Sequence, residues 1–331
     1  MPSEATSPPT QRPRVAITLG DPRGIGPEIV EEVMADPPAG AEYVVLGPEE
    51  MVASLPGERV QVRRVKSEKV SSEADAFHLS PFTYSPEAAA HQVAAQVERA
   101  VDLALGGEVD AIVTGPAEKH ALHLAGYRYP GHTEWLAALA GGVDVAMMLA
   151  AGPLRVVLVT THIPLKEVPA ALTRERILRV GALTQDALVQ WWGIDAPRLA
   201  VCAVNPHAGE HGLFGTEDEE ILAPAAESLG AAGPLPADTV FVRALRGEFD
   251  AVLAPYHDVG MTAIKVAAFG KAVNVTLGLP FIRTAPDHGT ALDIAGKGVA
   301  DAGSMREAVA LAVRLAQWSA AVRPLPPRRS P

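Results

Sequence analysis

The sequence is poor in cysteine, which excludes a disulfide-stabilised scaffold and a cysteine-rich zinc site. Cys202 is the single cysteine among 331 residues. It stands inside the apolar run 199–204, so we expect it to be a small core residue. A chain without disulfides is typical of a reducing compartment, and we therefore expect a cytoplasmic protein.

The sequence also lacks an excess of basic residues and any long apolar run. Lys and Arg number 28 against 39 Asp and Glu, which gives a net charge of −11. A protein that binds nucleic acid needs a basic face, so we expect no nucleic-acid partner. A small anionic substrate stays open, because one pocket can be basic on an acidic protein. No run reaches the roughly 18 apolar residues of a membrane span, and the N-terminus lacks the apolar segment of a signal peptide.

Short apolar runs alternate with amphipathic segments along the chain, and this alternation predicts an α/β fold with a parallel or mixed sheet. The runs are apolar on both faces, as expected of strands covered by helices on both sides. The predicted strands are 15–20, 43–47, 111–115, 145–150, 154–160, 199–204, 251–254 and 272–278. Helices are predicted at 87–105, 173–192 and 304–318, with Thr173 and Ser304 as N-caps of the last two.

A glycine-rich turn, GDPRGIGPE (20–28), follows the first predicted strand and opens a helix. Pro27 suits the first helical turn, and Glu28 suits its positive end. The glycines match neither the dinucleotide-binding pattern nor the phosphate-binding P-loop. A plain tight turn and a turn that approaches a ligand therefore both stay open.

Three histidines each stand just beyond a predicted strand: His162, His207 and His257. Ligands of open α/β sheets bind beyond the carboxyl ends of the strands. Three imidazoles suit a divalent transition metal and leave a position for substrate. The alternative is that each is an ordinary polar loop residue, because their spacing is not a local ligand motif. Asp258 either orients the His257 imidazole or is a solvated carboxylate.

Two further segments carry candidate binding groups. GHTEW (131–135) predicts a helix start with Thr133 as cap, and the free N–H groups at such an end bind anions. Lys265 and Arg283 lie in or beside apolar segments, where a charge needs a partner: an internal carboxylate or a bound phosphate or carboxylate. The loop 287–304 is either a turn-rich connector or a loop around a nucleotide, with Asp293 accepting from ribose or adenine.

Taken together, these stretches resemble the 4-hydroxythreonine-4-phosphate dehydrogenase family of vitamin B6 biosynthesis, from about residue 14 to about 320. The similarity is densest in GDPRGIGPEI, TGPAEKHALHLAG, GHTEW, TTHIPL, NPHAGEHGLFGTE, GPLPADT, YHDVGM and VNVTLGLPFIRTAPDHGTALDIAGKG. The last stretch also looks like the adenosine-binding loop of isopropylmalate and isocitrate dehydrogenases, whose fold this family shares.

The resemblance implies a fold of two α/β/α domains with a cleft between them. The first domain would comprise residues 14–132 plus 283–322. The second, residues 133–282, would carry the metal ligands and the interface of a homodimer with a shared active site. Residues 1–13 and 323–331 are expected to be flexible tails.

The resemblance also assigns roles to individual residues. The metal ligands, contributed by both subunits, match His162, His207 and His257. The groups that hold the phosphorylated substrate match His132, Thr133, Lys265, Asn274 and Arg283. The nucleotide loop matches Gly289, Thr290 and Asp293.

The implied reaction is oxidation of the substrate C3 hydroxyl by NAD, with NADP as an alternative, followed by loss of CO₂ to give 3-amino-2-oxopropyl phosphate. A divalent Zn, Mg or Co ion would lower the pKa of the hydroxyl and stabilise the enolate. NAD would accept the hydride, so the protein mainly has to position it. A proton acceptor is also needed, and Lys265 and Asp258 are both candidates.

One position departs from the family pattern: Val259 follows His257 and Asp258, where Gln is usual. Paralogues oxidise 4-phospho-D-threonate or 4-phospho-D-erythronate, and others act on aromatic cis-dihydrodiols. The anion-site residues favour a phosphorylated substrate. More distant alternatives are a phosphate acyltransferase-like enzyme and a non-catalytic metal- or anion-binding protein.

Overall fold

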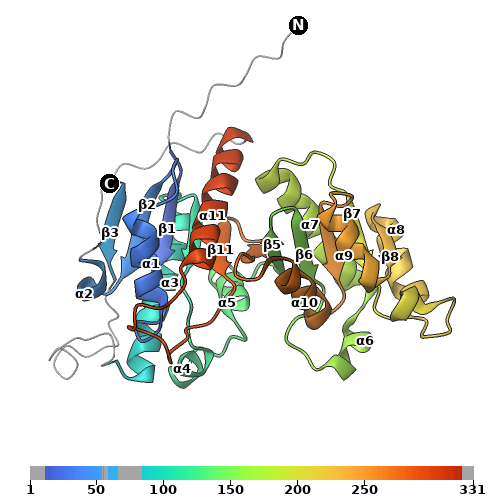
Figure 1. The fold of residues 1–331 in the computed structure, drawn as a ribbon, viewed down its shortest axis with the longest axis horizontal. Helices are drawn as coiled ribbons and strands as arrows, with labels where there is room; N and C mark the ends of the chain where they lie inside the picture. Colours follow the sequence, from blue (N-terminus) through green and yellow to red (C-terminus); the bar gives the residue numbers. More distant parts are fainter. Residues whose placement is uncertain (1–11, 54, 56–58, 66–83, 323–331) are drawn as a thin grey trace, which may run out of the picture. The chain divides into compact units, whose positions relative to one another are not determined.

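The structure is a computed structural model that describes residues 12–53, 55, 59–65 and 84–322 (Figure 1). Contacts between residues divide the chain into two compact units, one of residues 1–127 and 289–331 and the other of residues 128–288. The chain thus leaves the first unit once and returns to it. Most of the tails predicted at 1–13 and 323–331 lies outside the described residues.

The first unit contains a parallel sheet in the order β3-β2-β1-β4. Its strands are β1 (Arg14–Thr18), β2 (Glu42–Gly47), β3 (Val60–Arg64) and β4 (Ala111–Thr114). Its helices are α1 (Gly26–Ala35), α2 (Glu49–Val52), α3 (Pro86–Leu105), α4 (Lys119–Leu124) and α11 (Gly303–Val322). Helix α3 packs on β1, β2 and β4, while α11 packs on β1, β4 and α1. Strands β1 and β4 are buried on both faces, as their unbroken apolar sequences predict.

The second unit contains a mixed sheet in the order β11-β10-β5-β6-β9-β7-β8. Its strands are β5 (Ala146–Ala151), β6 (Leu154–Leu158), β7 (Leu199–Cys202), β8 (Ala232–Leu235), β9 (Ala251–Ala254), β10 (Val273–Leu277) and β11 (Ile282–Pro286). The pairs β11–β10, β10–β5 and β5–β6 are antiparallel, and the remaining neighbours are parallel.

The helices of the second unit cover both faces of this sheet. They are α5 (His132–Leu139), α6 (Val168–Ala171), α7 (Arg174–Trp192), α8 (Ala223–Leu229), α9 (Ala237–Leu245) and α10 (His257–Ala268). Short helical turns lie at Leu165–Glu167, Pro206–Gly209 and Asp218–Leu222. Helices α9 and α10 lie in front of the strands in Figure 1 and α7 behind them.

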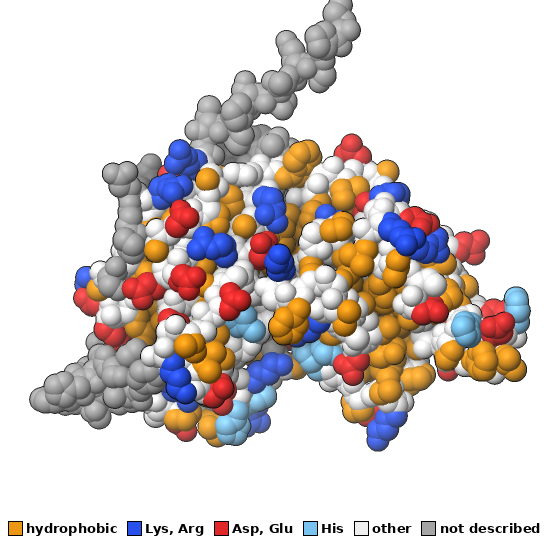
Figure 2. Space-filling view, in the orientation of Figure 1, with side chains coloured by type: hydrophobic (Ala, Val, Ile, Leu, Met, Phe, Trp, Pro, Cys, Tyr) orange, Lys and Arg blue, Asp and Glu red, His pale blue; other side chains and the backbone are white. Residues whose placement is uncertain are grey.

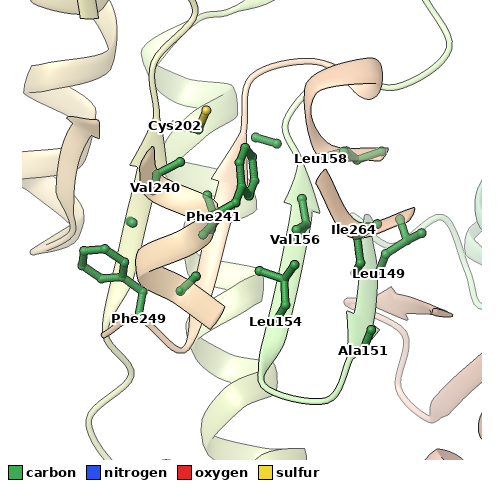
Figure 3. Close-up of a cluster of buried hydrophobic side chains, with 14 of the residues drawn as sticks. Leu149, Ala151, Leu154, Val156, Leu158, Cys202, Val240, Phe241, Phe249 and Ile264 are labelled. Atoms are coloured by element: carbon green, nitrogen blue, oxygen red, sulfur yellow. The ribbon is translucent and has the colours of Figure 1, made fainter. Parts of the chain in front are cut away.

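Alternate residues of the strands build the core beneath α9 and α10. Leu149, Val156 and Leu158 face Phe241 of α9 and Ile264 of α10 (Figure 3). The alternation follows from the two-residue period of a strand, which turns successive side chains to opposite faces. Cys202 belongs to this cluster and is fully buried, and burial raises the pKa of its thiol to about 12. The sequence-based expectation of a core cysteine is confirmed.

The α/β fold is confirmed, with three corrections at the ends of helices. Helix α11 begins at Gly303 rather than after Ser304, and Asp301 accepts the Gly303 N–H at 2.7 Å. The N-cap of α5 is Gly131, not Thr133. His257 opens α10 instead of lying in a loop. The Thr173 cap is confirmed, since its Oγ1 accepts the Arg176 N–H at 3.3 Å.

The described helices include none that is long and apolar enough to cross a membrane. On the face shown in Figure 2, acidic and basic side chains are interspersed among hydrophobic ones.

Candidate functional site

The neighbouring strands β6 and β9 bring two of the three predicted histidines together. The strands are parallel, with Leu158 opposite Ala254, so both end at the same edge of the sheet. Beyond that edge Thr160 Oγ1 donates to the Pro255 carbonyl at 2.8 Å. The rings of His162 and His257 have centroids 5.6 Å apart. Two imidazoles therefore meet where ligands of α/β sheets bind.

His207 stands in an unusual backbone segment after β7. His207, Ala208, Glu210 and His211 have φ values of 53°, 56°, 44° and 57°, so a run of non-glycine residues is left-handed. Each such residue costs about 1–2 kcal/mol relative to the right-handed region. The side chain of Asp218, 1% exposed, fixes the base of the loop by accepting the N–H groups of Val204 and Asn205 at 2.9 and 3.0 Å.

The described residues of one chain contain no group of three or more His, Cys, Asp or Glu side chains that could hold a metal ion. Within one chain, His207 therefore does not complete a site with His162 and His257. The pair of imidazoles is nevertheless suitable donor chemistry for a divalent transition metal. His257 Nδ1 lies 2.7 Å from Asp258 Oδ1, an arrangement that orients the ring and leaves Nε2 for a ligand. The three-histidine site stays a prediction.

Helix α10 continues from His257 along one face to Lys265. His257, Met261 and Lys265 are four residues apart, so they lie on the same side of the helix. They line an open pocket of about 650 Å³ together with Thr262, Val266 and Phe269. Val266 is 83% exposed and Phe269 87% exposed. The pocket thus combines an imidazole and an ammonium group with solvent-exposed apolar side chains.

Strands β10 and β11 place two predicted anion-binding residues on one face of the sheet. Asn274 is opposite Ala285, and Arg283 precedes Ala285 by two residues, so Asn274 and Arg283 project to the same side. Asn274 is also opposite Leu149, which belongs to the core cluster under α10. Both side chains therefore lie on the sheet face that α10 covers.

Arg283 is almost fully buried, at 4% exposed, and its Nη1 donates to Thr276 Oγ1 at 3.0 Å. Burial lowers the pKa of Arg283 to about 10, while the charge of Glu134 opposes that shift. Oxygen Oε2 of Glu134 and Oδ1 of Asn274 are buried and have no hydrogen-bond partner among the described residues. Glu134 follows His132 and Thr133 at the start of α5. This part of the second unit thus holds one buried guanidinium and two buried acceptor oxygens without a described donor.

The predicted nucleotide loop packs on the start of α1, within the first unit. The Thr290 carbonyl accepts the Ile25 N–H at 2.9 Å. A Cβ at Gly24 would lie 2.7 Å from the same carbonyl, so glycine is required there for close packing. Gly289 and Asp293 are exposed on this loop. Packing explains Gly24 without a ligand, and it joins the glycine-rich turn to a loop that is distant in sequence.

Sequence reasoning missed several charged residues. Asp21, 1% exposed, pairs with Arg23 at 2.8 Å, and Arg23 also pairs with Glu118 at 2.5 Å. Asp287 Oδ2 lies 3.3 Å from Lys265 Nζ. The available signal for Asp287 was its place directly after the apolar segment that carries Arg283. No sequence spacing links Lys265 to Asp287, because β10 and β11 bring them together.

Comparison with known proteins gives a consistent result. The family model described as pyridoxal phosphate biosynthetic protein PdxA matches residues 39–312. A 4-hydroxythreonine-4-phosphate dehydrogenase of Caulobacter vibrioides is 43% identical, covering 93% of this chain and 98% of the relative. A D-threonate 4-phosphate dehydrogenase of Cupriavidus necator is also 43% identical, covering 92% and 97%. A crystal structure of the 4-hydroxythreonine-4-phosphate dehydrogenase of Klebsiella pneumoniae has a TM-score of 0.80 at 38% identity, covering 92% and 99%.

Proposed function

Because this chain belongs to the PdxA family of pyridoxal phosphate biosynthetic proteins, we propose that it is a 4-hydroxythreonine-4-phosphate dehydrogenase. It oxidises the C3 hydroxyl of 4-phosphooxy-L-threonine with NAD. The resulting β-keto acid loses CO₂ and gives 3-amino-2-oxopropyl phosphate, for the synthesis of pyridoxal 5′-phosphate in the cytoplasm.

The observation that carries this proposal is the buried guanidinium of Arg283. A guanidinium that is 4% exposed is costly to desolvate in a core, and a bound anion would offset that cost. A bound phosphate would accept hydrogen bonds from Arg283 in planar, bidentate geometry. Lys265 would add a second cation from α10. The phosphorylated end of the substrate therefore belongs on this face.

His162 and His257 would hold a divalent metal, Zn, Mg or Co, with His207 of a second subunit as the third ligand. When bound, such an ion lowers the pKa of the substrate hydroxyl and stabilises the enolate left after decarboxylation. Asp258 orients the His257 imidazole through the 2.7 Å contact at Nδ1. The role of the protein is thus to fix the ligands and the substrate oxygen relative to each other.

Of the two candidate proton acceptors, the ion pair of Lys265 with Asp287 favours Asp258. An ammonium that donates to a carboxylate has no lone pair with which to accept a proton. The Asp258 side chain is 85% exposed, so it can pass a proton to water.

A homodimer with a shared active site is supported by apolar side chains near the predicted metal ligands. Leu213 and Phe214 are 72% and 46% exposed on the loop that carries His207. Val266 and Phe269 are exposed beside the pocket of His257. Exposed apolar clusters of this kind mark protein interfaces. A second subunit would cover them and bring its own histidine to the site.

For NAD, the support is the loop 289–298 packed on the start of α1. With Thr290 held at Ile25, the exposed Asp293 offers a carboxylate to an adenosine. NADP is the alternative cofactor.

A second candidate is oxidation of 4-phospho-D-threonate or 4-phospho-D-erythronate. It is favoured by D-threonate 4-phosphate dehydrogenases of Cupriavidus necator and Salmonella typhimurium, each 43% identical to this chain. Val259 stands at the position where Gln is usual, and its side chain packs against the core cluster under α10. Because valine has no side-chain amide, this position offers the substrate no hydrogen bond. Both candidates use the same phosphate site and differ at C2 of the acid.

The test is formation of NADH from each of the three phosphorylated acids, with and without Zn²⁺, Mg²⁺ or Co²⁺. We expect the highest kcat/KM with 4-phosphooxy-L-threonine. A preference for either sugar acid phosphate would support the second candidate. If none of the three yields NADH with any ion, both candidates are wrong.

Metal binding is tested separately by His257→Ala, which removes one of the two imidazoles that meet in the structure. We expect stoichiometric Zn²⁺ or Co²⁺ binding, measured by calorimetry, to be lost without loss of folding. His123→Ala, on the exposed side of α4, is the control. Unchanged metal stoichiometry in His257→Ala would refute the proposed ligand.

A further inference from the structure

We propose that Asp287 is a positioning residue for the substrate phosphate, which it serves by holding the ammonium of Lys265. The inference rests on the function proposed above and adds a residue to its binding site. The atoms concerned are Asp287 Oδ2 and Lys265 Nζ, 3.3 Å apart.

The location of Asp287 follows from the sheet. Asp287 comes directly after β11, two residues beyond Ala285 and four beyond Arg283, so it continues the row that projects toward α10. Lys265 stands on α10, which covers this face. One carboxylate therefore lies between the helix that carries Lys265 and the strand that carries Arg283.

Lys265 needs such a partner because its side chain is long. The lysine is 43% exposed, and a flexible four-carbon stem gives its ammonium no fixed position. Asp287 is 18% exposed and has a short side chain anchored at the end of a strand. An ion pair with the anchored carboxylate fixes Nζ while leaving two of its N–H groups for a phosphate.

The pair is poorly explained as a device for stability. Burial raises the pKa of Asp287, although the charges of Lys265, His288 and His257 oppose that rise. Desolvation of the carboxylate thus outweighs its favourable charge interactions, and the charged form costs folding free energy. Perturbed ionisable groups of this kind gather at functional sites.

Asp250 provides a matched comparison in the same unit. Its side chain is 15% exposed and pairs with Arg198, and Asp250 precedes β9 whereas His257 follows it, so the two lie at opposite ends of that strand. Burial raises the pKa of Asp250, but the hydrogen bonds and charge of Arg198 outweigh it and the net shift is downward. Asp250 therefore belongs to a structural ion pair, and its side chain is about as buried as that of Asp287. Asp250→Asn is the control variant.

The first experiment measures the reactivity of Lys265 and needs no enzymatic activity. The full-length protein is acetylated with acetic anhydride, and labelling of each lysine is followed by mass spectrometry. We expect Asp287→Asn to raise the labelling rate of Lys265 at least threefold, with exposed Lys271 unchanged as internal reference. Inorganic phosphate should slow labelling of Lys265 in the unaltered protein and have less effect in Asp287→Asn. Equal labelling and equal protection in the two proteins would overturn the proposal.

The second experiment is a double-mutant cycle on KM with the phosphorylated acid. Asp287→Asn should raise KM about tenfold with little change in kcat, because it weakens uniform binding of the phosphate. In a Lys265→Ala background the same change should have no further effect, and Asp287→Glu should restore part of the affinity. Additive effects would show that Asp287 does not act through Lys265, and they would refute the proposal.

The two experiments distinguish this proposal from the function on which it rests. If the unaltered protein forms no NADH from any phosphorylated acid, the proposed function fails. The labelling rates then still decide whether Asp287 holds Lys265 for an anion. Asp250→Asn should leave labelling and KM unchanged in both experiments.

Discussion

Arg283 combines nearly complete burial with a hydrogen bond to the Thr276 hydroxyl. Glu134 opposes the lowering of its pKa only in part. At the scale of a residue, burial of such a cation costs free energy that a bound anion would offset. A ligand with two negative charges gains more from such a group than from an arginine in water.

We predict that Arg283→Met lowers kcat/KM for the phosphorylated substrate about 100-fold or more, through loss of a charge-assisted bidentate contact. Steady-state kinetics measures the effect. Arg198→Met, which removes an exposed guanidinium paired with Asp250, should leave kcat/KM unchanged. Wild-type kinetics in Arg283→Met would place the phosphate elsewhere.

Asp287 predicts a specific dependence of stability on pH. Its folded-state pKa is raised above the ordinary 3.8, so the folded protein binds more protons than the unfolded chain in that window. The contribution of Asp287 to the free energy of unfolding is most favourable below pH 3.8, and it is lost as the pH rises through the folded-state pKa. Asp287→Asn should therefore gain stability relative to the unaltered protein as the pH rises from 3.8 toward neutrality.

Denaturant unfolding at several pH values measures this difference. Asp250→Asn should instead lose stability relative to the unaltered protein as the pH rises. The pKa of Asp250 is lowered in the folded state, so this carboxylate stabilises the fold above its unfolded-state pKa. A stability difference for Asp287→Asn that shrinks as the pH rises would contradict the account.

At the scale of elements, the strands of the core and the long helices follow directly from sequence. Each predicted strand is present, because short runs dominated by β-branched and other apolar residues, such as the VVL of β6, favour a buried strand. Strands β3, β8 and β11 were missed. Their sequences, VQVRR, AGPL and IRTAP, contain charges, glycine or proline that hide the apolar pattern.

The candidate site was predicted less completely, for a physical reason. His162 and His257 could be paired because parallel strands end at one edge. Glu134 and Asp287 could not be linked to Arg283 and Lys265, since antiparallel pairing of β10 with β5 and β11 sets those neighbours. Sequence reasoning from resemblance named the anion-binding residues but not the carboxylates around them.

The segment after β7 holds several non-glycine residues in the left-handed region, which costs conformational free energy. Ala208 has φ 56° and ψ 42°, a conformation that glycine adopts without the steric cost of a Cβ. Ala208→Gly should therefore stabilise the protein by about 0.5–1 kcal/mol. Thermal unfolding measures the change. The same replacement at right-handed Ala226 in α8 should destabilise, and destabilisation by Ala208→Gly would argue against this backbone.

At the scale of the whole molecule, the account requires two subunits to form one metal site. The exposed side chains of Val266 and Phe269 lie beside the pocket of His257, where a partner would pack. If the protein forms the proposed dimer, Phe269→Asp should convert it to a monomer in light scattering and abolish high-affinity metal binding at the same time. The exposed Val299, in the loop after Asp293, offers the control Val299→Asp, which should remain dimeric.

A monomeric unaltered protein that binds the metal at full stoichiometry would contradict the shared site. A monomeric Phe269→Asp variant that still binds the metal at full stoichiometry would also contradict the shared site. Among the described residues, one chain brings only His162 and His257 together.

We propose that this chain oxidises a phosphorylated hydroxy acid on the face formed by Arg283, Asn274 and Lys265. The most direct measurement is NADH formation from 4-phosphooxy-L-threonine with a divalent ion, for the unaltered protein and for Arg283→Met. We expect NADH formation coupled to release of CO₂ in the unaltered protein and strongly reduced NADH formation in Arg283→Met. No NADH from this substrate, from 4-phospho-D-threonate or from 4-phospho-D-erythronate would contradict it.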